Sequence, residues 1–121
     1  MLQTGSVVVC ADNSGAKNLQ IVNILGSRQR FASLGSVVTC VVMGAISDAN
    51  VKNHEVVRAV VVRTKKEVRR KDGSYIRFDD NAAIVIDKNK VPRCTRVFGP
   101  IAREIRDLGH TKIASLAKEV W

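Results

Sequence analysis

The sequence predicts an all-β fold: a five-stranded small β-barrel with a projecting two-stranded basic ribbon and short C-terminal helices. Two observations carry this prediction: short runs rich in Val and Ile recur along the 121 residues, and turn-forming Gly, Asn, Asp and Ser separate them. β-Branched runs of this length, bounded in this way, are typical of strands rather than helices. Strands of this number and spacing favour a small closed or nearly closed barrel. The five runs cover residues 6–11, 18–25, 35–43, 55–64 and 81–86.

The second of these runs, NLQIVNIL at 18–25, does not alternate simply. Leu19 and Ile21 fall on one face of an extended strand, whereas Val22 and Ile24 fall on the other. We therefore expect this strand to be partly buried on both faces.

A basic segment, RTKKEVRRKDGSYIR, lies between the fourth and fifth runs and belongs to the predicted ribbon, at about 63–80. Seven basic residues and two acidic ones fall between Arg63 and Arg77. Asp72 and Gly73 predict a two-residue type I′ hairpin turn, in which glycine readily takes the positive φ required. Neither face of the outgoing strand is apolar enough to bury, so we expect the ribbon to project beyond the barrel.

The chain changes character after residue 98. GPIAREIRDLG predicts a short helix with Pro100 as its first residue. Ile101, Ile105 and Leu108 form the apolar stripe of this helix. KIASLAKEV predicts one or two further helical turns.

The length bounds the organisation of the chain, because 121 residues can bury one modest core but not two. We expect a single domain at 1–121, made of the barrel at about 1–98 and a helical part at about 99–121. No run approaches the roughly 18 apolar residues that span a bilayer, and the start lacks a signal-peptide pattern. We therefore expect no membrane partner. The odd count of three cysteines favours a reducing compartment.

The net charge of +9 and the pI near 10.0 predict a polyanionic partner, with nucleic acid as the leading candidate. The charge is concentrated in the ribbon, where like charges repel one another unless anions neutralise them. Aromatic residues make up only 4% of the chain, and the two near the ribbon are Tyr75 and Phe78. The composition therefore favours shape and backbone recognition of folded RNA over the stacking of splayed bases.

The residues give little support to an enzyme. Asp79 and Asp80 are adjacent, so in a strand they point to opposite faces, and a solvated or turn-capping role is favoured over a paired-carboxylate site. His54 and His110 stand without other ligands at metal-binding spacing. We expect no catalytic residue, no metal site and no cofactor. We interpret the three cysteines as small buried hydrophobic residues: Cys10, Cys40 and Cys94.

Three stretches, ADNSGAK, RAVVVRTKKEVRRKDGSYIRFDDNAA and TRVFGPIAREIRD, resemble the universal L-fourteen family of large-subunit ribosomal proteins, in its bacterial or organellar form. The resemblance runs essentially end to end. It implies a non-enzymatic structural role in the large subunit and binding to large-subunit rRNA. It also implies two further partners, neighbouring large-subunit proteins and small-subunit rRNA across the subunit interface. The implied location is the ribosome, in the bacterial cytoplasm or in a mitochondrial or plastid matrix.

Carried onto this sequence, the resemblance implies two sets of contact residues. Such proteins also receive, on their C-terminal face, a silencing factor that blocks subunit joining. The positions that match this subunit-interface and silencing-factor face are Thr95, Arg96 and Lys112. The implied rRNA contacts are Lys17, Arg28, Arg30, Arg63, Lys65, Lys66, Arg69, Arg70, Lys71 and Arg77.

Two positions depart from the family pattern. The family's basic loop is replaced by SDANVKNHE at 47–55, which keeps Lys52 but loses most of the charge. The family's glycine before the Thr-Arg pair is Cys94, which argues against a positive φ at that point.

Two other classes of function stay open on the residues alone. A protein-interaction adaptor would pair its ribbon edge to edge with a partner strand, while the charge keeps that edge soluble. A hydrolase would use Asp79 or Asp80 and is the least favoured alternative.

Overall fold

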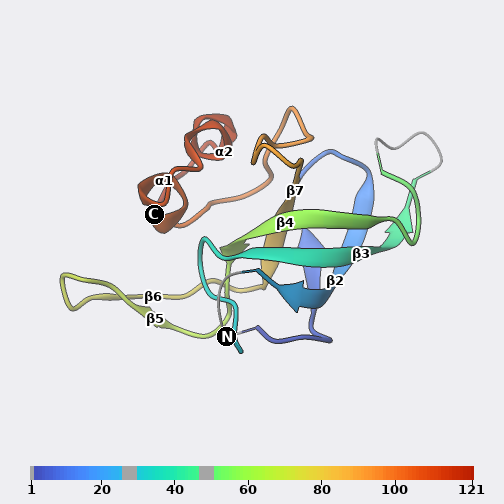
Figure 1. The fold of residues 1–121 in the computed structure, drawn as a ribbon. Coiled ribbons are helices and arrows are strands. Elements are labelled where there is room, and N and C mark those ends of the chain that lie inside the picture. The colour runs from blue at the N-terminus through green and yellow to red at the C-terminus, as the bar shows by residue number, and fades with distance from the viewer. Residues whose placement is uncertain (1, 26–29, 47–50) are drawn as a thin grey trace.

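The computed structural model describes residues 2–25, 30–46 and 51–121. Among them, five strands close a barrel, two shorter strands form a ribbon, and two short helices lie over the barrel wall (Figure 1). This arrangement confirms the predicted fold class. No helix in this part of the chain is long and apolar enough to cross a membrane. The elements are β1 (Val7–Cys10), β2 (Ala16–Ile24), β3 (Val37–Ala45), β4 (Val56–Arg63), β5 (Val68–Arg69), β6 (Tyr75–Ile76), β7 (Ala82–Ile86), α1 (Glu104–Asp107) and α2 (Thr111–Leu116).

The barrel closes because β7 pairs with both β4 and β1. From β1 to β4 each strand is antiparallel to the next, and β7 is antiparallel to β4. β7 is parallel to β1, where Val9 lies opposite Ala82. Each predicted apolar run contains or overlaps one of these five strands. Since a closed sheet leaves no free edge in its wall, the barrel gives a fixed base from which the ribbon leaves.

The expectation that the NLQIVNIL strand is partly buried on both faces, with Val22 and Ile24 together on the second face, is wrong. The pairing of β2 with β3 shifts register between Ile21 and Asn23, which makes Val22 an extra, bulged residue. Val22 is 42% exposed, whereas Ile24 is buried in the barrel interior. The change of parity in the sequence therefore reflects a bulge that returns Ile24 to the same core as Ile21.

β7 and the second half of β4, from Ala59 onward, are buried on both faces. The barrel interior covers one face, and the C-terminal segment covers the other. On β4, Val61 packs inside the barrel and Val60 packs outside it. The outer cluster joins Val60 to three fully buried isoleucines of the C-terminal segment, Ile101, Ile105 and Ile113. This second core holds the helices against the barrel wall at the side from which β4 leads into the ribbon (Figure 1).

The C-terminal segment forms two helices, but the first begins later than predicted. α1 begins at Glu104, so Pro100 is not its first residue. Ile101 instead forms a parallel bridge with Val120, and the carbonyl of Pro100 accepts a hydrogen bond from Arg63. Because residues 100 and 101 make these tertiary contacts, the helix begins only after them.

The predicted apolar stripe is confirmed for Ile101 and Ile105 and is wrong for Leu108, which is 61% exposed. α1 ends at Asp107, so Leu108 no longer continues the buried helical face. Its side chain lies over Gly35 instead, where a Cβ would collide with it.

The predicted two-residue type I′ turn of the ribbon is also wrong. The Arg70 N–H donates to the Ser74 carbonyl, and the Gly73 N–H donates to the Arg70 carbonyl, so the loop has three residues. Within it only Gly73 has a positive φ, +89°, which describes a type I turn followed by a left-handed glycine. Hydrogen bonds from the Ser74 hydroxyl and N–H lower the pKa of the Asp72 carboxyl, which caps the turn.

Candidate nucleic-acid interface

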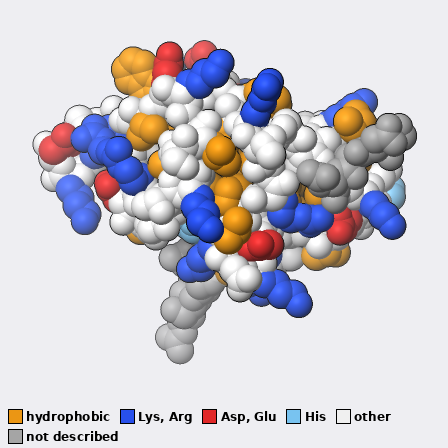
Figure 2. Space-filling view, turned by 90° about the horizontal axis from the view of Figure 1, so that it is seen from above, with side chains coloured by type: hydrophobic (Ala, Val, Ile, Leu, Met, Phe, Trp, Pro, Cys, Tyr) orange, Lys and Arg blue, Asp and Glu red, His pale blue; other side chains and the backbone are white. Residues whose placement is uncertain are grey.

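The ribbon presents cations on a narrow hairpin that stands away from the barrel. β5 and β6 form a separate two-stranded sheet in which Arg69 lies opposite Tyr75. Figure 1 shows the ribbon extending to one side of the molecule, and Figure 2 shows Lys and Arg side chains at that end as well as scattered over the face seen from above. Side chains placed in this way can reach phosphates without the barrel approaching them. The exposed basic residues of this segment are Lys65, Lys66, Arg69, Lys71 and Arg77.

The one ion pair described among these exposed cations, between Lys66 and Glu67, is weak. Lys66 Nζ lies 3.1 Å from Glu67 Oε1, with side chains 63% and 45% exposed. The backbone N–H of Glu67 and this lysine lower the pKa of the Glu67 carboxyl. A pair so exposed contributes little to stability, so an RNA phosphate can compete for the lysine at small cost.

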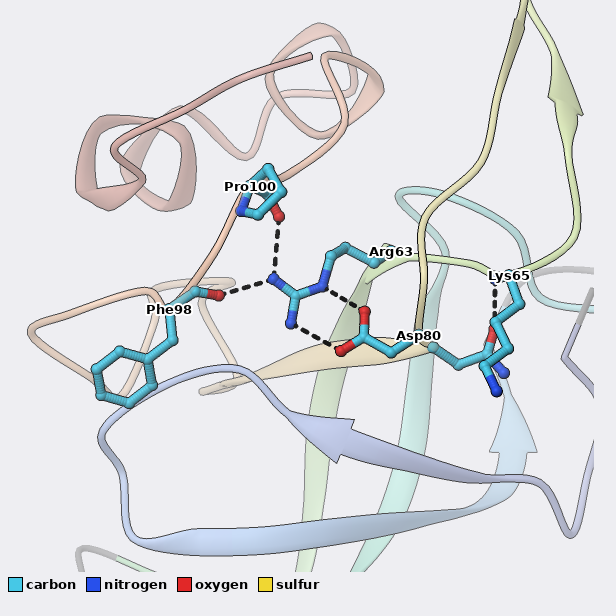
Figure 3. A network of polar contacts seen from close by, with 6 residues as sticks. Arg63, Lys65, Asp80, Phe98 and Pro100 are labelled. Atoms are coloured by element: carbon cyan, nitrogen blue, oxygen red, sulfur yellow. Dashed lines mark hydrogen bonds and ion pairs between the residues drawn. The ribbon is translucent and has the colours of Figure 1, made fainter.

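Arg63, at the end of β4, is occupied inside the protein (Figure 3). Its side chain is 9% exposed, and Nε lies 2.9 Å from Asp80 Oδ1. Its Nη2 donates to Asp80 Oδ2 at 3.3 Å, and Nη1 donates to the carbonyls of Phe98 and Pro100 at 2.7 and 3.1 Å. The guanidinium thus joins the end of β4, the returning ribbon strand and the chain that leads to α1. This geometry argues against Arg63 as an rRNA contact, and we interpret it as a residue that positions the ribbon.

Gly99 lies against this set of Arg63 hydrogen bonds, which we call the Arg63 clamp. It has φ +81°, and a Cβ at this position would collide with Arg63 Nη1. Lys65, two residues beyond the arginine, donates its backbone N–H to Asn81 Oδ1 at 2.9 Å, which ties the two strands of the ribbon root together (Figure 3).

Arg70 is only partly available. Its Nε lies 2.8 Å from Glu104 Oε1 on α1, with side chains 12% and 27% exposed. The angles are not those of a hydrogen bond, because Arg70 Nε, Arg70 Nη2 and Glu104 Oε2 are buried without a hydrogen-bond partner. We describe the contact as an ion pair that holds one face of the ribbon against α1. The expectation that neither face of the outgoing strand is buried is therefore wrong for this face.

The remaining predicted rRNA contacts lie apart from the ribbon or outside the described structure. Lys17 is exposed on β2, with its side-chain stem against Gly44 near the end of β3. Because β3 is antiparallel to β4, this position is at the barrel end opposite the ribbon root. Arg30 is exposed between β2 and β3, at the ribbon end of the barrel. Arg28 lies outside the described residues.

A second surface contains the three residues of the predicted subunit-interface face. Asn13 Oδ1 accepts hydrogen bonds from the backbone N–H groups of Thr95 and Arg96, and Asn13 Nδ2 donates to Thr95 Oγ1 at 2.7 Å. Arg96 and Leu116 line one hollow, and Lys112 lies one helical turn before Leu116 on α2. All three predicted residues, Thr95, Arg96 and Lys112, are exposed.

Two residues of the ADNSGAK stretch, Asp12 and Asn13, anchor the loop between β1 and β2, and the sequence analysis did not single them out. Asp12 is 4% exposed; its Oδ1 accepts from the Ser14 N–H and hydroxyl, and its Oδ2 accepts from the Val85 N–H at 2.9 Å. Asn13, next to it, makes the bonds to Thr95 and Arg96. The hydrogen bonds of the buried Asp12 carboxylate hold this loop in place. The loop in turn positions Asn13, which binds Thr95 and Arg96 of the second surface. The preference of Asn and Asp for turns was visible in the sequence, whereas their partners more than 70 residues away were not.

The cysteines, and the His, Asp and Glu side chains outside these two surfaces, are of the types that build metal-binding and catalytic sites. All three cysteines are free and buried, as interpreted, and burial raises the pKa of the Cys10 and Cys40 thiols to about 12. Cys94 does not have a positive φ, as its side chain implied. Within the described ranges, His, Cys, Asp and Glu nowhere gather in threes that could hold a metal ion. Asp80 pairs with Arg63 rather than with Asp79.

Comparison with known proteins identifies the family. The model of the family described as ribosomal protein L14p/L23e matches residues 1–121, the whole chain. The chain belongs to this family. A relative from Petrotoga mobilis, named large ribosomal subunit protein uL14, is 58% identical over 122 residues, covering all of both chains. The family resemblance is therefore confirmed, and as a ribosomal protein the chain is a structural component of the ribosome rather than an enzyme.

Proposed function

We propose that the protein is a constituent of the large ribosomal subunit that binds large-subunit rRNA through the exposed cations of its ribbon. Membership of the family supports the setting, and the observation that carries the RNA contact is the separate hairpin with its exposed cations. The barrel and the Arg63 clamp hold the hairpin in one orientation, so its side chains meet phosphates without first being ordered. Such contacts fix register and orientation on RNA rather than read its sequence.

We further propose that the surface of Thr95, Arg96 and Lys112 faces the subunit interface and receives small-subunit rRNA or a silencing factor. The support is the rigidity of this surface, since Asn13 holds residues 95 and 96 from a different part of the barrel. The P. mobilis relative fits a bacterial cytoplasmic ribosome, and we propose that location for this chain.

The proposal is tested by competition for assembly in cells. The variant Arg69→Gln/Lys71→Gln is co-expressed with the wild-type chain, large subunits are isolated at low magnesium, and both forms are quantified by mass spectrometry. We expect the variant to be several-fold under-represented, because two phosphate contacts are lost.

The matched control, Lys88→Gln/Arg106→Gln, removes one lysine and one arginine that are exposed outside the ribbon and outside the second surface. It should be incorporated at parity with the wild-type chain. Parity of the ribbon variant would overturn the proposed RNA contact and would favour an adaptor role that tolerates loss of ribbon charge. Absence of the wild-type chain from large subunits would overturn the setting as well.

A further inference from the structure

A hollow of about 740 Å³ lies between the root of the ribbon and the end of the described chain. Its walls include Tyr75 and Ile76 of β6, Phe78 and Trp121, so three of the five aromatic residues of the sequence meet here. The volume is within the roughly 300–1,000 Å³ of ligand pockets. Sequence reasoning placed only Tyr75 and Phe78 near the ribbon, because nothing local to Trp121 predicts that the chain returns to this point.

Trp121 is held in place while its ring stays accessible. Its backbone N–H donates to the Ile101 carbonyl at 2.8 Å, and Nε1 donates to Glu119 Oε2 at 3.1 Å. Figure 1 shows this end of the chain beside α1 and above the ribbon. The residue is nevertheless 60% exposed, and Tyr75 is 65% exposed. An exposed ring held in this way, like that of Trp121, contributes little to the core and provides a stacking surface at a small cost in conformational entropy.

The hollow is continuous with the cations of the ribbon. Tyr75 lies directly opposite Arg69 across the β5–β6 pair, and cross-strand partners project from the same face of a hairpin. Arg77 and Asp79 are both exposed and supply polar groups at the wall of the hollow. A strand of RNA whose phosphates contact Arg69 and Arg77 would therefore pass directly beside the aromatic rings.

We infer that this hollow takes an unpaired nucleobase of the bound RNA, stacked on Trp121 and Tyr75. The inference rests on the proposed RNA binding by the ribbon and names a contact within it. A base fits the combination of apolar faces with a polar rim, because it has an apolar π-face and hydrogen-bonding edges. The preference for backbone recognition over stacking, based on the scarcity of aromatic residues, is revised at this one point.

The single tryptophan of the chain makes the inference directly testable, because all intrinsic indole fluorescence comes from Trp121. The purified full-length protein is titrated with a single-stranded oligoribonucleotide, a blunt RNA duplex and inorganic polyphosphate. We expect the single-stranded RNA to quench the fluorescence. Polyphosphate should bind the ribbon and leave the fluorescence unchanged, because it carries no bases. Quenching by polyphosphate equal to that by RNA would overturn the inference.

Two variants at one position separate stacking from structure. Binding of fluorescein-labelled single-stranded RNA is measured by anisotropy, and circular dichroism verifies the fold. Trp121→Ala should bind about 5- to 150-fold more weakly, the range for loss of one stacked base, whereas Trp121→Phe should stay within a few-fold of the wild-type chain. Binding by Trp121→Ala that equals wild type would overturn the inference.

The same experiments distinguish a failure of the base site from a failure of the proposed RNA contact by the ribbon. Suppose that Arg69→Gln/Lys71→Gln weakens RNA binding, that Trp121→Ala binds RNA like the wild-type chain, and that RNA does not quench the fluorescence. The ribbon contact is then supported, and the base site is wrong. If the Trp121→Ala protein binds RNA normally yet enters large subunits poorly, the hollow holds a neighbouring protein instead, and the inference is again overturned.

Discussion

The root and the tip of the ribbon contain the same kinds of residue and use them differently. At the root, Arg63 is 9% exposed and donates to a carboxylate and two carbonyls. At the tip, Arg69 of β5 and Lys71 of the turn are exposed. Cations whose hydrogen bonds are satisfied internally stabilise the fold, and cations left in solvent are free to bind an anion. The charge density along the sequence therefore overestimates how many cations are available to bind an anion.

The largest effect should come from Arg63→Met, which leaves the Asp80 carboxylate and the Phe98 and Pro100 carbonyls without their donor. We expect a loss of roughly 2–3 kcal/mol in the free energy of unfolding, below the 3–5 kcal/mol of a fully buried pair because Asp80 is 40% exposed. Urea denaturation measures it. Arg69→Met, the same change at the tip, should stay within about 0.5 kcal/mol of wild type. Equal losses at both positions would remove the distinction between root and tip.

Two glycines extend the comparison from charge to shape. Gly99 at the root and Gly73 at the tip have φ of +81° and +89°, so alanine is strained at both by roughly 1–2 kcal/mol. A Cβ at Gly73 has no atom within 4 Å, whereas one at Gly99 meets Arg63 Nη1. Gly99→Ala should therefore cost about 0.5–1 kcal/mol more than Gly73→Ala, since it also disturbs a hydrogen bond of Arg63. Thermal unfolding of both variants measures the difference. Equal destabilisation would mean that the Arg63 side chain moves aside without losing stability.

The Arg70–Glu104 pair lies between these extremes. Arg70→Met alone should cost about 1–2 kcal/mol, because it leaves a largely buried carboxylate unpaired. The double variant Arg70→Met/Glu104→Met should cost less than either single change, because the pair leaves three buried polar atoms without hydrogen bonds. A double-mutant cycle in urea gives the coupling. Additive losses would show that the two residues act independently.

The smallest effect concerns pH and a residue away from the ribbon. His110 precedes α2, is 5% exposed, and burial together with nearby Lys90 lowers its pKa below 6.5. The unfolded chain therefore binds a proton that the folded chain resists, so stability should fall as the pH drops below about 6.5 and level off below the folded pKa. Urea midpoints between pH 7.5 and 5 measure the slope.

Two asparagine variants isolate this contribution. His110→Asn should flatten part of the slope, and His54→Asn, at an exposed position, should leave it unchanged. A slope that persists in His110→Asn would assign the pH dependence to other groups.

The fold could be predicted because its signals are local. Val- and Ile-rich runs and the turns between them can be recognised without long-range information, and these patterns predicted the five strands of the barrel. Apart from the ribbon turn, the misassigned features depend on contacts distant in sequence. Pro100 does not start a helix because it contacts Arg63, and Leu108 is exposed because α1 ends early. The parity change at Val22 is compatible with either a two-sided strand or a bulge, and only the pairing with β3 decides between them.

The candidate site could be predicted as a region but not residue by residue. Arg63 and Arg69 belong to one basic run, and nothing in that run separates them. What separates them is a carboxylate 17 residues away and carbonyls 35 and 37 residues away. Trp121 is likewise held near the ribbon root by the bridge between Val120 and Ile101 and by its own backbone hydrogen bond to the Ile101 carbonyl.

The division of the basic run into a structural root and an RNA-binding tip is tested most directly by the salt dependence of RNA binding. The wild-type chain, Arg69→Gln/Lys71→Gln and Arg63→Met are each titrated with a large-subunit rRNA fragment at several salt concentrations, with folding verified at each. The account predicts that the tip variant reduces the slope of log K against log salt by about 2, one for each lost phosphate contact. It predicts that folded Arg63→Met keeps the wild-type slope. A slope reduced by Arg63→Met and unchanged in the tip variant would contradict the account.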